Sequence, residues 1–177
     1  MKKLLIGLAV VSVIFAACNG KMSVSTNGVA ADSTAAMIAK NKQTAINSEM
    51  AILKKDIDGI YKDCSADFVD YGSEEYKPMT KIDSLKINMK QFLDAFPDMK
   101  VENMKAFADS NTVVITGTWS GTFTKEFMKI PPTKKTYKLP DADIFTFNKE
   151  GKITSHRSIQ SEIAYLTQLG VPLPPKK

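Results

Sequence analysis

Residues 111–135 read NTVVITGTWSGTFTKEFMKIPPTKK, and this stretch predicts a long strand, a turn and the start of a returning strand. Its side chains alternate between two kinds, which is the period of a β-strand with two different faces. One face carries the apolar and glycine positions, namely Val113, Ile115, Gly117, Trp119, Gly121 and Phe123. The other face carries β-branched and hydroxyl side chains, namely Val114, Thr116, Thr118, Ser120, Thr122 and Thr124. Glycines inside a strand mark bends or a close approach of backbone, so we expect a curved sheet.

The aromatic face of this strand has two possible roles. Trp119 and Phe123 either fill the hydrophobic core or form the wall of a pocket that the bent sheet encloses. Both roles require Trp119 to be buried. A turn at Pro131 and Pro132 then leads the chain into a returning strand.

The order of the other elements predicts an α+β fold. Helical periodicity is expected from Ser33 or Thr34 to about Lys54, over 56–62, and from Thr80 to Ala95, with a short strand at 68–72. Four strand candidates follow at 99–108, 112–127, 135–148 and 152–160, and a short helix at 161–169. The connections between these strands are short enough for hairpins. We therefore expect a curved antiparallel sheet wrapped on three N-terminal helices.

The N-terminus has the pattern of a bacterial lipoprotein. A basic start, an apolar run over 4–15 and the small residues Ala16 and Ala17 precede Cys18. This run is too short to span a bilayer and matches a secretory signal instead. We expect a signal peptide over 1–17, a lipidated flexible tether over 18–33, and one domain over 34–177. The lipid on Cys18 would hold the domain at a membrane of the bacterial cell envelope. The alternative is a plain signal peptide with a chance cysteine.

The charge and cysteine content of the chain limit the partners and the covalent links that we expect. The chain has 177 residues and a formal net charge of +5, and without Lys2 and Lys3 the 22 basic and 19 acidic side chains give +3. This mild, dispersed charge argues against a nucleic-acid partner. Only two cysteines are present, so lipidation of Cys18 leaves Cys64 without a disulfide partner.

Several short stretches, in order along the chain, together resemble one family. They are Asp67–Tyr71, Ala95–Asp98, Gly121–Thr124, Glu126–Met128, Ile130–Thr133, Asp143–Phe145, Gly151–Ile153 and Gln168–Gly170. Over about 42–171 the chain resembles the SnoaL-like polyketide cyclase, or ester cyclase-like, branch of the nuclear transport factor two-like superfamily. The resemblance implies a cone-shaped α+β barrel with one deep, mainly apolar pocket. We expect Tyr71, Trp119, Phe123 and Phe145 to line this pocket and to bind a small apolar molecule.

The chain departs from the family pattern at positions that matter for chemistry. Family members often have a histidine where Tyr71 and Phe123 stand, and glycines where Lys125, Lys129 and Lys134 stand. The cyclases carry an acid/base aspartate late in the sheet, whereas residues 156–161 here read HRSIQS and contain no carboxylate. The resemblance therefore implies the fold more strongly than it implies the cyclase reaction.

Two residues are the candidates for catalysis. Asp143 shares a strand face with Asp141 and Phe145, and a carboxylate in apolar surroundings can act as a general acid/base. The alternative is a structural acid that accepts hydrogen bonds at the strand end. His156 is the one histidine, and it points either to solvent or into a polar pocket wall.

No metal site, cofactor or nucleophile follows from spacing along the chain. One histidine cannot form a multi-histidine site, no acids have ligand spacing, and Ser158 and Ser161 lack a nucleophile-elbow context. Two classes of function remain: a lipoprotein that binds a small apolar molecule, or a cyclase or isomerase that uses Asp143 or His156 on a carbonyl-bearing substrate. The sheet could also form the contact of a homodimer.

Overall fold

The computed structural model describes residues 26–73 and 77–173, with side chains from Ser33 onward. The expected signal peptide and Cys18 lie outside the described residues. Helix α1 spans Thr26–Leu53 and therefore begins before Ser33, inside the expected tether. The stretch from Ala30 to Ala36 holds four alanines and no glycine or proline, which favours a helix even though Asp32, Ser33 and Thr34 are weaker helix formers. None of the helices in the described residues has an apolar stretch long enough to cross a membrane.

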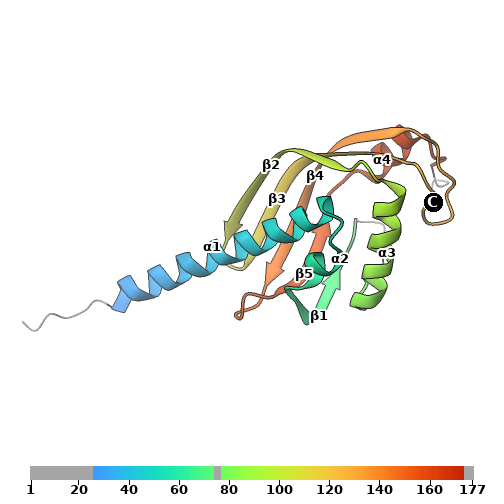
Figure 1. Ribbon diagram of the computed structural model, residues 1–177. Helices are drawn as coiled ribbons and strands as arrows, with labels where there is room; N and C mark the ends of the chain where they lie inside the picture. Colours follow the sequence, from blue (N-terminus) through green and yellow to red (C-terminus); the bar gives the residue numbers. More distant parts are fainter. Residues whose placement is uncertain (1–25, 74–76, 174–177) are drawn as a thin grey trace, which may run out of the picture.

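Four helices and one five-stranded sheet make up the described part of the chain. The helices after α1 are α2 (Ile57–Tyr61), α3 (Ile82–Ala95) and α4 (Glu162–Leu169). The strands are β1 (Cys64–Asp70), β2 (Lys100–Asp109), β3 (Thr112–Thr122), β4 (Thr136–Phe147) and β5 (Ile153–Ser158). The strand order is β1-β5-β4-β3-β2. Figure 1 shows a curved sheet with α1 running across it and α3 beside its β1 edge.

The sheet is mixed rather than purely antiparallel. Strands β2 to β5 pair antiparallel in chain order, as the short connections predict. Strand β1 instead lies parallel to β5, with Asp70 beside His156. A strand that precedes α3 and three other strands reaches this edge by a crossover, which local sequence patterns do not reveal.

The inner face of the sheet carries two hydrophobic clusters at its two ends. The first core cluster lies under α1 and α2 and consists of Ala45, Ala51, Ile60, Tyr61, Phe68, Leu85, Leu93, Val113, Ile115, Phe145, Phe147 and Ile153. The second core cluster consists of Ala95, Phe96, Trp119, Phe123, Tyr137, Leu139 and Leu169. The alternation along β3 places both ends of this strand in the core.

The glycines of β3 mark close approach, as expected. A side chain at Gly117 would meet the Val101 side chain at 2.7 Å, where β2 is interrupted by a bulge. A side chain at Gly121 would meet Tyr137 at 3.3 Å and Phe96 at 3.4 Å. Both glycines thus let neighbouring side chains of the core approach the strand.

Candidate functional site

A group of polar side chains interrupts the apolar inner face of the sheet. Asp70 ends β1, Asp143 lies in β4 and His156 lies in β5. The register brings them together because His156 pairs with Asp70 on one side and with Phe145, two residues from Asp143, on the other. Glu49 reaches the same place from α1, where it lies on the inward stripe with Ala45. These four residues are called the acidic cluster below.

His156 lies between two carboxylates. Its Nδ1 is 3.2 Å from Oδ1 of Asp70, and its Nε2 is 3.2 Å from Oδ1 of Asp143. Both ring nitrogens can donate only when the imidazole is protonated. Burial alone would lower the pKa of His156, but the hydrogen bonds to Asp143 and Asp70 outweigh burial and raise this pKa well above its usual range. These contacts favour the protonated form of the ring.

Asp70 is fixed on its other side by the backbone. The N–H of Gly72 donates to Oδ1 of Asp70 at 2.8 Å. Burial opposes ionisation of Asp70, but the hydrogen bond from His156 and this backbone contact lower its pKa below the ordinary value. Asp70 is thus a carboxylate that orients the imidazole.

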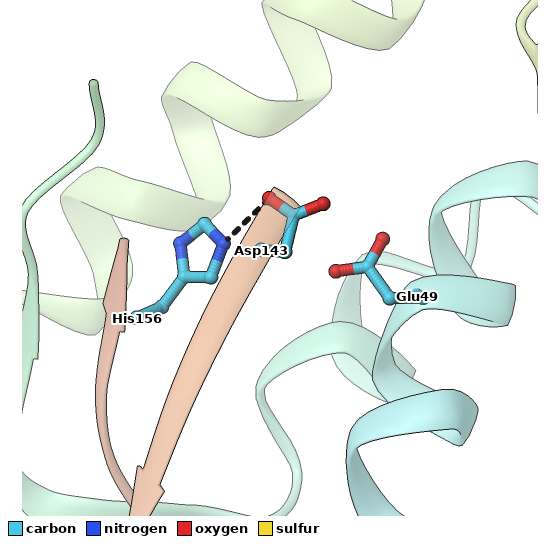
Figure 2. A group of neighbouring side chains, drawn as sticks. All are labelled: Glu49, Asp143 and His156. Atoms are coloured by element: carbon cyan, nitrogen blue, oxygen red, sulfur yellow. Dashed lines mark hydrogen bonds and ion pairs between the residues drawn. The ribbon is translucent and has the colours of Figure 1, made fainter. Parts of the chain in front are cut away.

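Glu49 is the most deeply buried acid of the cluster. It is 2% exposed, and its Oε2 atom has no hydrogen-bond partner among the described residues. Burial, followed by the charge of Asp143, raises the pKa of Glu49 well above the ordinary value. Figure 2 shows the Glu49 carboxyl group extending from its helix toward Asp143 and His156.

Asp141 adds a further acid next to this cluster. Its carboxylate accepts hydrogen bonds from Oγ of Ser158 at 3.0 Å and from Nε2 of Gln160 at 3.3 Å. Burial and the nearby charge of Asp143 raise the pKa of Asp141 from 3.8 to about 6, against the lowering effect of the Ser158 hydrogen bond.

A groove of about 940 Å³ lies between α3, the β3–β4 loop and the end of β5. Its apolar lining consists of Tyr61, Met79, Leu85, Met89, Phe92, Phe127, Met128 and Tyr165. Polar or charged residues also line it, namely Asp70, Ser73, Lys77, Asn88, Gln91, Glu126, Lys129, Ser158, Gln160 and Glu162. A chamber of about 40 Å³ lies deeper, lined by Glu49, His156 and Phe145 among others. Tyr61, Asp70 and Met89 line both spaces, so the groove and the chamber meet there.

The structure brings the two catalytic candidates, Asp143 and His156, into contact. His156 does not point to solvent, because its ring packs on Phe145 with 5.0 Å between ring centroids and lines the chamber. Asp143 is buried and bonds to His156. The sequence prediction for these two residues therefore identified half of the acidic cluster.

Of the four residues expected to line the pocket, Phe145 lies at the chamber, and the other three lie elsewhere in the structure. Trp119 and Phe123 belong to the second core cluster, and neither lines the groove or the chamber. Trp119 pairs with Leu139, four residues along β4 from Asp143, so it lies at the other end of the sheet. Tyr71 does not line the groove or the chamber either, and instead packs under the guanidinium group of Arg157 at 4.7 Å.

Sequence analysis missed Glu49 and Asp70. Glu49 follows Ala45 and Ile46 by four and three residues, so a charged side chain on the apolar stripe of α1 was a usable signal. Asp70 gave no such signal, because its role depends on the parallel pairing of β1 with β5.

Potential metal ligands also come from residues that are distant in the sequence and meet only in the folded structure. One ligand atom each from Glu49, Asp143 and His156 lies within 4.8 Å of the others, although the three residues have no ligand spacing along the chain.

Comparison with known proteins gives the family. The model of the SnoaL-like polyketide cyclases matches residues 45–169, which is most of the chain. The chain belongs to this family. The matched residues include α1 from Ala45, all five strands and α4, and they contain the whole acidic cluster.

Solved structures of SnoaL-like proteins share the fold. AclR from Streptomyces galilaeus, assigned as a hydroxylase, is 28% identical with a TM-score of 0.64, over 77% of this chain and 99% of AclR. A protein from Jannaschia sp. CCS1, assigned as a SnoaL-like polyketide cyclase, is 16% identical with a TM-score of 0.69, over 77% and 96% of the two chains. A phenazine biosynthesis-related protein from Pseudomonas aeruginosa is 20% identical with a TM-score of 0.64, over 82% and 95%. No curated protein matches the chain.

The raised pKa of Asp141 predicts a pH-dependent effect of Asp141→Asn. Because the folded pKa of about 6 exceeds the ordinary 3.8, ionisation of Asp141 destabilises the fold as pH rises from about 4 to about 6. The free energy of unfolding of the variant, minus that of the wild-type protein, should therefore increase across this interval. Urea titrations in metal-free buffer at several pH values measure this difference.

Asp98→Asn is the matched control. Hydrogen bonds from Thr122 lower the pKa of Asp98, so its carboxylate stabilises the fold at neutral pH and this contribution is lost as pH falls. The difference for this variant should change with pH in the opposite direction. Identical pH dependence of Asp141→Asn and the wild-type protein would contradict the raised pKa.

Proposed function

We propose that the protein binds a small, mainly apolar molecule in the groove, with a polar group of that molecule directed at Asp70, Ser158 and Gln160. The groove volume of about 940 Å³ suits a small organic ligand, and its lining supports the proposal. Eight apolar or aromatic side chains supply contact area, and polar groups among the other lining residues can orient a carbonyl or hydroxyl group.

The flexible side chains of the lining favour a ligand with an apolar body. Met79, Met89 and Met128 border the groove on three sides, from the segment after β1, from α3 and from the β3–β4 loop. Methionine adapts its shape to irregular apolar surfaces. The aromatic rings of Phe92 and Phe127 lie 5.5 Å apart and provide a firmer wall.

Acid–base turnover of the same ligand is a second candidate, favoured by the position of Asp70. This residue lines the groove and bonds to His156, which bonds in turn to Asp143. A polar group at the inner end of the groove would therefore meet a hydrogen-bonded chain that can pass a proton. The family name, polyketide cyclase, and the assignment of AclR as a hydroxylase agree with chemistry on a small molecule. The chemistry of such a cyclase is a proton taken from carbon and one given to oxygen.

Attachment to a membrane is part of this proposal and rests on the sequence alone. A lipid on Cys18 would hold the domain at the bacterial cell envelope while leaving the groove on the folded domain. Metabolic labelling with a palmitate analogue tests this. We expect labelling of the wild-type protein and none of Cys18→Ala, and equal labelling of both would contradict the lipid anchor.

Met128→Ala tests the groove. Met128 lines the groove and is 56% exposed, so its replacement should leave the fold intact. Ile163→Ala is the matched control, since Ile163 is 67% exposed and does not line the groove. For a panel of fused-ring aromatic ketones as probes, measured by calorimetry, we expect Met128→Ala to weaken binding by about tenfold, roughly the effect of losing 1–2 kcal/mol of apolar contact.

Two outcomes would contradict this function. One is binding of no ketone in the panel, and the other is equal loss of affinity in Met128→Ala and Ile163→Ala. The variant Asp70→Asn distinguishes turnover of the ligand from binding alone, because asparagine keeps the shape of the aspartate side chain. Any proton exchange at the carbon next to the ketone carbonyl, followed by NMR in heavy water, should fall in this variant while binding persists. No exchange in the wild-type protein would leave binding as the function.

A further inference from the structure

Three potential metal ligands from three separate elements meet beside the chamber, which Glu49 and His156 line. They are a carboxylate oxygen of Glu49 from α1, one of Asp143 from β4, and a ring nitrogen of His156 from β5. All three atoms lie within 4.8 Å of one another. The 3.2 Å between Nε2 of His156 and Oδ1 of Asp143 is close to the separation of about 3.3 Å expected for two ligands of one zinc ion.

Glu49 gives an independent indication of a missing binding partner. Its side chain is 2% exposed, and Oε2 receives no hydrogen bond from any described residue. A buried carboxyl oxygen without a partner is costly, so native proteins normally satisfy such an atom with a donor, a water molecule or an ion. Figure 2 shows this carboxyl group directed at the other two side chains. The adjoining chamber of about 40 Å³ has room for an ion or one water molecule.

Asp70 supplies the support that metal-binding histidines usually have. Its Oδ1 lies 3.2 Å from Nδ1 of His156, on the side of the ring away from Asp143. A carboxylate that accepts the Nδ1 proton fixes the tautomer in which Nε2 is free to bind a metal. Asp70 is itself held by the Gly72 N–H, so the ring orientation is preset.

We propose that Glu49, Asp143 and His156 bind one divalent transition-metal ion between them, beside this chamber, with Asp70 orienting His156. One imidazole and two carboxylates suit Zn²⁺ or Co²⁺, whereas Ca²⁺ takes six to eight oxygen ligands. Binding replaces the proton on Nε2 of His156, and that proton leaves to solvent. Three protein ligands leave a coordination position open for water or for a ligand group. The metal site is separate from the proposed groove ligand, and either can exist without the other.

Calorimetric titration of the metal-free full chain with Zn²⁺ at neutral pH tests the site. We expect one ion per chain. Glu49→Gln and His156→Gln should each weaken binding by about 100-fold, and Asp70→Asn by about 10- to 100-fold, the range for residues that orient ligands. Asp141→Asn is the matched control, since it removes a nearby acid that is not in the ligand set, and it should weaken binding much less than Glu49→Gln does.

Co²⁺ gives a second measurement that does not depend on affinity alone. Bound Co²⁺ should show visible absorption bands of a tetrahedral or five-coordinate site in the wild-type protein and in Asp141→Asn, and these bands should be absent from Glu49→Gln. Circular dichroism shows whether each variant is folded, and Asp70→Asn extends the test if Glu49→Gln is not. The proposal would be overturned by the absence of saturable Zn²⁺ binding, or by binding and spectra that persist unchanged in Glu49→Gln. Failure of the ketone probes to bind would leave the metal result unaffected.

Discussion

The imidazole of His156 contacts a carboxylate at each end of its ring, and these contacts join β1, β5 and β4 inside the protein. Removing one partner from a buried ion pair leaves an uncompensated charge, at a cost of about 3–5 kcal/mol. The parallel attachment of β1 therefore depends on polar pairing as well as on backbone hydrogen bonds. A chain without this imidazole would have to bury Asp70 and Asp143 without a cation between them.

The acidic cluster lies between the two hydrophobic clusters on the inner face of the sheet. Apolar clusters on both sides exclude water, which raises the pKa of Glu49 and Asp141. Such a site stabilises the fold less than a fully apolar core would, as buried polar networks commonly do. Local departures from good packing of this kind occur preferentially at functional sites. The groove meets the acidic cluster at Asp70. These destabilising buried acids therefore lie where a ligand in the groove can reach them.

Much of the fold follows from periodicity, and the site follows from it only in part. Alternation along β3 predicts that Trp119 is buried, as it is, but alternation does not say whether a buried residue fills the core or lines a pocket. Asp143 and His156 are visible in the sequence as a charged residue on an apolar face and as the one histidine. Their partners are not, because Asp70 arrives by a parallel crossover and Glu49 by the packing of a helix. Long-range pairing is information that local pattern does not contain.

Ring-nitrogen NMR measures whether His156 is protonated between Asp70 and Asp143. Because the sequence holds one histidine, ring-nitrogen NMR of the untagged, ¹⁵N-labelled, metal-free protein needs no assignment. We predict that both ring nitrogens carry protons at neutral pH and that the imidazolium titrates well above 6.5. The stabilisation from the raised pKa is then fully present below 6.5 and is lost as pH rises through the folded pKa. A neutral ring with one protonated nitrogen at neutral pH would contradict the account.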